Sequence, residues 1–143
     1  MSFDLKIVDG DISVGTNNDL DIVENTDKLV QDIVKIVFTP LGSNPFHPWY
    51  GSPITRSLIG RAYDKAFTSV IATQQLQASL TRLQSLQFDQ LRRNQLVTAS
   101  EQLAAIKSVN IDRNVNDPRF FTIFLTVLTK AFSRVDIPVT VRI

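Results

Sequence analysis

The sequence has no cysteine, a single histidine and only two glutamates. Without cysteine the chain has no disulfide framework, no thiolate metal site and no cysteine nucleophile. One histidine without cysteine cannot make an ordinary zinc site. A glycine-rich phosphate loop, a G-x-S-x-G turn and an H-E-x-x-H helix are also missing. We therefore expect neither a cofactor nor an enzymatic activity.

An excess of charge of one sign is also missing, because 15 basic residues stand against 14 acidic ones. Only Arg92 and Arg93 are adjacent, whereas binding to a phosphate backbone needs clustered cations. No apolar run is long enough for a transmembrane helix, and residues 1–6 lack the pattern of a signal peptide. We expect a soluble chain made in the cytoplasm, with neither nucleic acid nor membrane as a partner.

The acidic residues that cluster do so near a turn and a helix start, at Asp19, Asp21, Glu24 and Asp27. Acids are expected there as caps, as partners of the helix dipole and on solvated strand faces. Calcium binding is a weaker interpretation, because the spacing lacks the central glycine and final glutamate of an EF-hand loop. The cluster predicts no metal site.

The chain has 143 residues, of which 43% are apolar and 20% charged, so we expect one domain over residues 1–143. Strand-like alternation over residues 3–23 predicts a small β meander. An amphipathic helix is predicted over 26–38, with Asn25 or Thr26 as its N-cap. Because strands, helices and strands follow one another without βαβ alternation, the fold class is predicted to be α+β.

Residues 38–53 form the most distinctive segment, with four of the six prolines, the only Trp and the only His. Proline excludes a helix here, and Gly42 and Gly51 mark sharp turns. The aromatic side chains predict a rigid loop docked on the rest of the chain. For His47 we expect a ring packed or hydrogen-bonded within this loop.

A long helix is predicted over about residues 64–91, with Leu76, Leu80 and Leu83 spaced by four and three. These leucines either face the chain's own core, with the glutamines in solvent, or pack on helices of other subunits. Helix length favours the second alternative. About 28 residues span about 42 Å, which exceeds the roughly 32–34 Å diameter of a compact domain of this size. Residues 98–101 then predict the start of another helix, where either Thr98 and Glu101 form a capping box or Ser100 caps the helix alone.

The chain ends in two alternating segments, 119–129 and 137–143, that predict an antiparallel sheet. One face of the first segment is wholly apolar, which is typical of a central strand. In the second segment Pro138 indicates a position near an edge. Arg119 follows a predicted turn, where it either closes the turn or is presented to a carboxylate of a partner.

Several short motifs occur in a characteristic order: Asp19–Val23, Thr39-Pro40-Leu41-Gly42 and Pro48-Trp49-Tyr50-Gly51-Ser52. In this order and spacing the chain resembles the baseplate wedge and sheath-initiator family of contractile phage tails, of the baseplate assembly protein W type. The family's acid–arginine signature would fall at Glu101-Gln102, where the acid is kept and glutamine replaces arginine. Arg113 or Arg119 could then substitute for that arginine.

The resemblance implies a structural protein of the virion tail baseplate, made in the host cytoplasm and present in six copies. Its implied partners are the sheath protein and baseplate wedge proteins, with tail tube or hub proteins as further candidates. The sheath would add strands to an open sheet edge. The expected partner-binding residues are Leu76, Leu80, Leu83, Glu101, Arg119, Ile137, Val139 and Val141. The alternatives are a generic α+β oligomerisation domain and, further behind, a tail-associated peptidoglycan hydrolase using Glu24 and Glu101.

Overall fold

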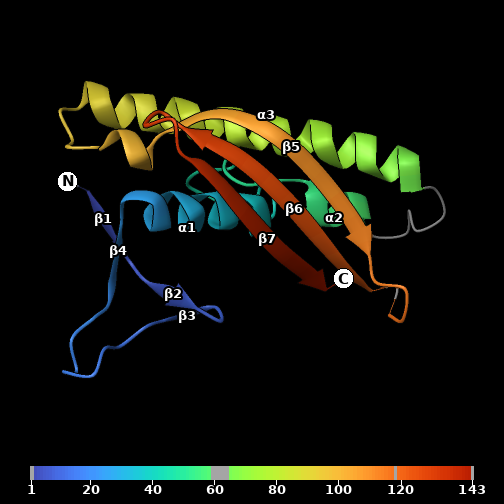
Figure 1. Cartoon of the computed structure of the whole chain (residues 1–143), viewed down its shortest axis with the longest axis horizontal. Helices are drawn as coiled ribbons and strands as arrows, with labels where there is room; N and C mark the ends of the chain where they lie inside the picture. Colours follow the sequence, from blue (N-terminus) through green and yellow to red (C-terminus); the bar gives the residue numbers. More distant parts are fainter. Residues whose placement is uncertain (1, 59–64, 118, 143) are drawn as a thin grey trace.

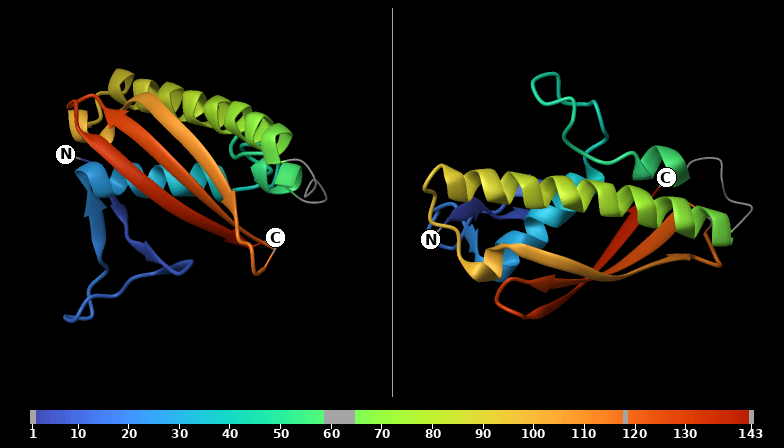
Figure 2. Two further views of the ribbon diagram at one scale, coloured as in Figure 1. Left: turned by 45° about the vertical axis from the view of Figure 1, so that its right-hand side comes forward. Right: turned by 90° about the horizontal axis from the view of Figure 1, so that it is seen from above.

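The computed structural model describes residues 2–58, 65–117 and 119–142, and it has the α+β architecture that the sequence predicts (Figure 1). Two helices, α1 (Asn25–Phe38) and α3 (Lys65–Arg92), lie on one face of a C-terminal three-stranded antiparallel sheet (Figure 2). A short helix, α2 (Ile54–Leu58), lies near the start of α3. The predicted start of the long helix at Asp64 lies outside the described residues.

The predicted N-terminal meander is two small antiparallel pairs, which we call the N-terminal ribbon (residues 2–24). β1 (Phe3–Leu5) pairs with β4 (Ile22–Glu24), and β2 (Ile7–Val8) pairs with β3 (Asp11–Ile12). Asp9 and Gly10 both have positive φ, as a tight two-residue hairpin turn requires. In Figures 1 and 2 the β2–β3 end projects away from the helices and the sheet.

The base of the N-terminal ribbon is fixed to α1 by polar side chains. Gln31 of α1 donates its amide to the Leu5 carbonyl (2.8 Å) and accepts from the Ile7 amide N–H (2.9 Å). Lys35 pairs with the Asp4 carboxylate and with Asp32 (3.3 Å). The ribbon is thus an arm with an anchored base.

The prediction that Asn25 or Thr26 caps α1 is wrong. The N-cap is Glu24, which makes no capping hydrogen bond through its side chain, and the helix begins at Asn25. The Asn25 N–H is instead 3.4 Å from a carboxylate oxygen of Glu101, 76 residues away in sequence. A local pattern could not reveal this cap because the acceptor comes from another part of the fold.

The sheet has the order β5 (Leu103–Arg113), β6 (Phe120–Thr129), β7 (Arg134–Arg142). The prediction of a central strand is confirmed, since β6 pairs with both neighbours. The prediction of a helix starting at residue 98 is wrong, because a single 3₁₀ turn, η1 (Ala99–Glu101), leads directly into β5. The capping box itself is present: the Thr98 N–H donates to the Glu101 carboxylate at 3.1 Å.

The core lies between the helices and the apolar face of β6. Alternate residues of β6 point into it, as the sequence predicts, while Phe124 on the opposite face is 46% exposed. The same core takes in Leu29, Ile33 and Ile36 of α1. It also contains the long-helix leucines. The buried members from α3 and β6 are Ala72, Leu76, Leu80, Leu83, Phe121, Ile123, Leu125 and Val127.

Candidate partner-binding surfaces

The leucine spacing on α3 serves the chain's own core. Leu76 and Leu80 are fully buried and Leu83 is 5% exposed. This is the first of the two alternatives that the sequence left open, and it corrects the expectation that these three residues contact other subunits. The length of α3 does not require contact with another subunit, because the helix runs along the sheet (Figure 2) and its leucines belong to the chain's own core.

Glutamines of α3 do not all face solvent either. Gln87 occupies the next position of the 76–80–83 spacing and is buried. Its amide donates to the Glu101 carbonyl (2.8 Å), and its oxygen accepts from the Leu103 N–H (2.9 Å). Gln84 donates to the carbonyls of Leu103 (3.2 Å) and Ala104 (3.0 Å). Side chains of α3 therefore hydrogen-bond main-chain groups at the start of β5. The four–three spacing of the leucines continues to residue 87, and this pattern could have indicated that Gln87 is buried.

Glu101 is a buried structural group rather than an exposed partner contact. Its carboxylate accepts hydrogen bonds from the Ser2 hydroxyl (2.7 Å), the Thr98 N–H and the Asn25 N–H. It is 0% exposed, so no partner or polysaccharide can reach it in this conformation. This placement corrects the expected partner-binding role, and it removes the carboxylate pair on which the hydrolase alternative depends.

Neither Arg113 nor Arg119 takes the place of the family arginine beside Glu101. Arg113 ends β5 and Arg119 precedes β6, whereas Glu101 precedes the opposite end of β5. Gln102, which stands at the arginine position, is 7% exposed and donates to the carbonyls of Val97 (3.4 Å) and Thr98 (3.3 Å). The glutamine amide thus closes the turn that leads into β5.

Arg119 is exposed and forms an ion pair with Asp117, with Nε 3.2 Å from the carboxylate. The hydrogen bonds from Arg119 lower the pKa of Asp117, and the same carboxylate raises the pKa of Arg119. The Arg119 N–H also donates to Asp117 (3.0 Å). This is the turn-closing alternative. The arginine remains on the surface, so a contact with a partner stays a prediction.

β7 is an edge strand, as Pro138 indicated. Within the described ranges it pairs with β6 and with no second strand. The Thr129 N–H donates to the Ser133 carbonyl (2.9 Å), so this pair marks a hydrogen-bonded position of the hairpin. Positions alternate along an antiparallel pair, so Arg134, Asp136, Pro138, Thr140 and Arg142 direct their main-chain groups away from β6. Proline, which has no N–H, sits where no donor to β6 is needed.

This alternation corrects the choice of Ile137, Val139 and Val141 as the residues that bind a partner strand. Ile137 is 3% exposed and Val139 packs at the margin of the core. The register pairs the three residues with Leu125, Ile123 and Phe121 of β6. In a strand, residues two apart point their side chains to the same face and their main-chain N–H and C=O groups in the same direction. The main-chain groups of these three apolar residues are therefore already hydrogen-bonded to β6.

Two side chains protect the outer edge of β7. Asp136 accepts from the Thr126 hydroxyl (2.7 Å) and from Arg134 (3.2 Å), and these hydrogen bonds lower its pKa. Charged residues on an exposed edge reduce unwanted pairing with other chains. Residues 139–142 lie beyond this pair, and Arg142 there places its guanidinium over the Phe120 ring of β6, 5.7 Å from the centroid.

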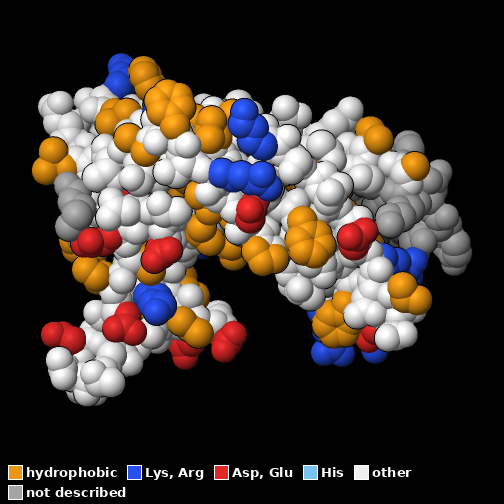
Figure 3. Space-filling model, in the orientation of Figure 1, with side chains coloured by type: hydrophobic (Ala, Val, Ile, Leu, Met, Phe, Trp, Pro, Cys, Tyr) orange, Lys and Arg blue, Asp and Glu red, His pale blue; other side chains and the backbone are white. Residues whose placement is uncertain are grey.

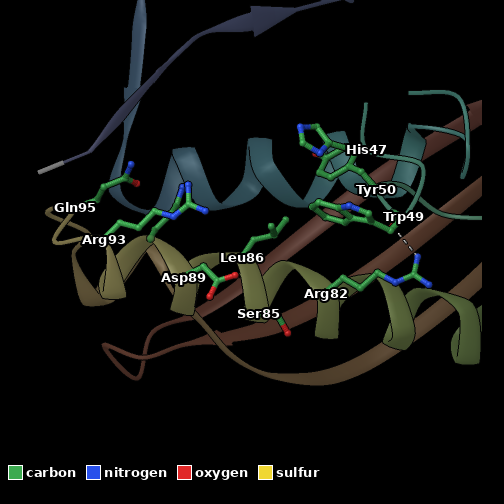
Figure 4. A pocket seen from close by; sticks show the side chains of 10 residues that line it. His47, Trp49, Tyr50, Arg82, Ser85, Leu86, Asp89, Arg93 and Gln95 are labelled. Carbon is green, nitrogen blue, oxygen red and sulfur yellow. Dashed lines mark hydrogen bonds between the residues drawn. The ribbon is translucent and has the colours of Figure 1, made fainter. Parts of the chain in front are cut away.

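The proline-rich loop (residues 38–53) is anchored at its ends and at Trp49, but the prediction that its aromatic side chains dock it on the chain holds only in part, because Phe46 is 87% exposed. Its two ends meet where the Ser52 N–H donates to the Thr39 carbonyl (2.8 Å), and Gly42 and Gly51 both have positive φ. Arg82 of α3 donates to the Trp49 carbonyl (2.9 Å), shown by the dashed line in Figure 4. The His47 and Trp49 rings meet edge to face with centroids 5.3 Å apart, which is the packed role expected for the histidine.

Between this loop and α3 lies a groove of about 640 Å³, which we call the α3 groove. Figure 4 shows Trp49 and Tyr50 on one side and the helix residues on the other. Trp49 is 45% exposed; Arg82, Leu86 and Asp89 come from α3, and Arg93 comes from the turn directly after it. Burial raises the pKa of Tyr50, against the opposing effect of Lys35. An arginine–aromatic groove of this kind was not predicted from the sequence.

Other kinds of site receive no support from the geometry. In the described part of the chain, no three His, Cys, Asp or Glu side chains lie close enough to hold a metal ion. None of the helices described is long and apolar enough to cross a membrane. Neither the protein-family models nor the curated proteins contain a match to this chain.

Proposed function

We propose that this protein is a structural component of a contractile phage tail baseplate, where it joins wedge subunits and initiates the sheath. The observation that carries the proposal is the outer edge of β7, which no strand among the described residues pairs with, on a sheet whose apolar face is packed against the core. An exposed edge offers main-chain groups to an extended segment of another protein. A buried core behind it keeps the template rigid before the partner arrives.

The outer edge of β7 is divided by Pro138 into two short stretches. Main-chain N–H and C=O groups of Arg134 and Asp136 lie on one side, and those of Thr140 and Arg142 on the other. An incoming strand loses one hydrogen bond opposite the proline. The proposed site is therefore residues 139–142, because the Arg134–Asp136 pair guards the first stretch.

The partners follow from the family resemblance and are part of the proposal. The sheath protein would supply the added strand, wedge proteins would contact the remaining surface, and tail tube or hub proteins are further candidates. The assembled form would hold six copies in the virion, after assembly in the host cytoplasm. In this role the protein has no enzymatic activity.

The test removes one outward-facing donor without disturbing the β6–β7 ladder. Thr140 is exposed and pairs with Thr122 at a position whose N–H points away from β6. Thr140→Pro should leave the thermal unfolding midpoint nearly unchanged, because proline is tolerated on edge strands. It should abolish seeding of candidate sheath protein into tubes, counted by electron microscopy. Thr140→Val, which keeps the N–H, is the matched control.

Equal seeding by Thr140→Pro and Thr140→Val would contradict strand addition at this edge. The substitution is preferable to deleting residues 137–143, because Ile137 is part of the core and its loss would unfold the sheet.

A further inference from the structure

Charge is unevenly distributed between the N-terminal ribbon and the rest of the chain. Residues 2–24 contain six acidic side chains and one lysine, a formal charge of −5. The remaining residues contain fourteen Lys and Arg against eight Asp and Glu, a formal charge of +6. Figure 3 shows the acidic side chains gathered over the ribbon at the lower left. The near-neutral total therefore hides two oppositely charged regions.

The N-terminal ribbon also exposes apolar side chains in cross-strand pairs. Ile7 lies opposite Ile12, with 42% and 48% of each exposed, and Val14 lies opposite Leu20 in an isolated bridge. These residues belong to an arm whose base is anchored on α1 and whose end projects from the molecule (Figure 1). An exposed arm that is both apolar and acidic is typical of a segment that docks on another protein.

The α3 groove has the complementary properties. Trp49 and Leu86 provide apolar surface, and Arg82 and Arg93 outnumber the one lining acid, Asp89. Residues 82–95, which are the end of α3 and the turn after it, carry three arginines against one aspartate. No residue of the ribbon lines the groove, so the ribbon of the same chain does not fill it.

We propose that the N-terminal ribbon of one copy docks into the α3 groove of a second copy. The apolar pairs Ile7–Ile12 and Val14–Leu20 contact Trp49 and Leu86, while the surrounding carboxylates face Arg82 and Arg93. Aromatic and arginine side chains at the centre of an interface carry most of its binding energy. This inference is independent of the proposed role in sheath initiation.

Such a contact is head-to-tail, because it joins two different surfaces. Each copy that uses its ribbon leaves its own groove free, so association continues into a closed ring or an open filament. A two-fold symmetric dimer would instead use the same surface on both copies. The difference gives the proposal a direct test.

The first experiment measures the mass of the purified protein by analytical ultracentrifugation over a wide concentration range, at low and high salt. We expect association at low salt that weakens at high salt, because salt screens exposed charges. Asp11→Lys/Asp19→Lys in the ribbon and Arg93→Glu in the groove should each weaken association at least about tenfold. Lys107→Glu changes the charge by as much as Arg93→Glu does, but on the exposed surface of β5, and it should have no such effect.

The second experiment mixes a ribbon variant with a groove variant. Asp11→Lys/Asp19→Lys keeps its groove, and Trp49→Ala keeps its ribbon, so an equimolar mixture should give one heterodimer and nothing larger. Trp49 is the only tryptophan, so every emission signal in the mixture comes from the intact groove. That emission should shift to shorter wavelength as the groove is occupied. Ile12→Ser is a second ribbon variant, and circular dichroism checks that each variant is folded.

A protein that stays monomeric at low salt up to millimolar concentration would overturn the proposal. So would association that Arg93→Glu leaves unchanged, or a mixture of the two variants that remains monomeric. If only a different protein binds in the groove, the purified protein would stay monomeric.

Discussion

At the residue scale, the least expected feature is the buried carboxylate of Glu101. It joins three segments that are distant in sequence, through Ser2, Asn25 and Thr98. A buried carboxylate is costly unless donors surround it, and here a hydroxyl and two backbone N–H groups do so. The same group places a negative charge beside the N-terminus of α1, where the helix dipole stabilises it.

The ion pair between Asp4 and Lys35 should make the stability of the protein depend on pH. Burial raises the pKa of Asp4, but the hydrogen bond and the charge of Lys35 outweigh it, so the pKa lies below its ordinary value of 3.8. A carboxyl group with a lowered pKa stabilises the fold above its unfolded pKa, and this contribution disappears as the pH falls through the lowered value.

We therefore expect Asp4→Asn to reduce the free energy of unfolding at pH 7 and to have a smaller effect in acid, where the wild-type carboxyl is protonated. Urea unfolding at a series of pH values measures both. Asp27→Asn is the control, because Asp27 lies in the same region without an ion pair to Lys35. A difference between wild type and Asp4→Asn that is constant down to pH 2 would contradict this account.

At the element scale, the closing of the proline-rich loop depends on one glycine. Gly51 has φ +113°, and a Cβ atom there would lie 2.4 Å from the Thr39 carbonyl oxygen. Gly42 also has a positive φ, of +81°, but a Cβ atom there would meet nothing within 4 Å. A side chain at Gly42 would therefore meet only backbone strain, whereas a side chain at Gly51 would meet both backbone strain and steric overlap.

Gly51→Ala should destabilise the protein by more than Gly42→Ala. The second change carries only the backbone penalty of about 1–2 kcal/mol, whereas the first also forces apart the Thr39–Ser52 closure. Chemical denaturation gives both free energies, and Trp49 fluorescence reports whether the loop remains docked on α3. Equal losses for the two variants would show that the close approach at Gly51 relaxes at no cost.

At the scale of the whole molecule, the core depends on leucines of α3 that meet α1 and the sheet. Leu80 is fully buried among them. Its replacement by aspartate would place an unpaired charge in the core, at a cost comparable to the stability of a domain, about 5–15 kcal/mol. The same helix offers an exposed position one turn earlier, Gln77.

Leu80→Asp should therefore abolish cooperative thermal unfolding, while Gln77→Asp should leave it nearly intact. Leu80→Ala, which keeps the fold, should lower the free energy of unfolding by about 2–5 kcal/mol. Calorimetry distinguishes these outcomes. A folded, cooperative Leu80→Asp protein would mean that this leucine is available to other subunits after all.

The sequence by itself determined the local features, because each depends on residues that are near neighbours in the chain. Asp9-Gly10 specified a tight turn and Gly51 a positive φ, while strict alternation marked the buried face of β6. The period of four and three identified the apolar stripe of α3, although not which surface covers it. These patterns reflect steric and hydrogen-bonding limits that do not require knowledge of the rest of the fold.

Only the tertiary structure decided what each element contacts. It placed Gln87 in the core against β5, turned Glu101 inward, and left the outer edge of β7 unpaired by any described strand. It also brought Trp49 and Arg93, 44 positions apart in sequence, to one groove. Such choices follow from which surfaces meet when distant segments pack together, and nearby sequence does not encode them.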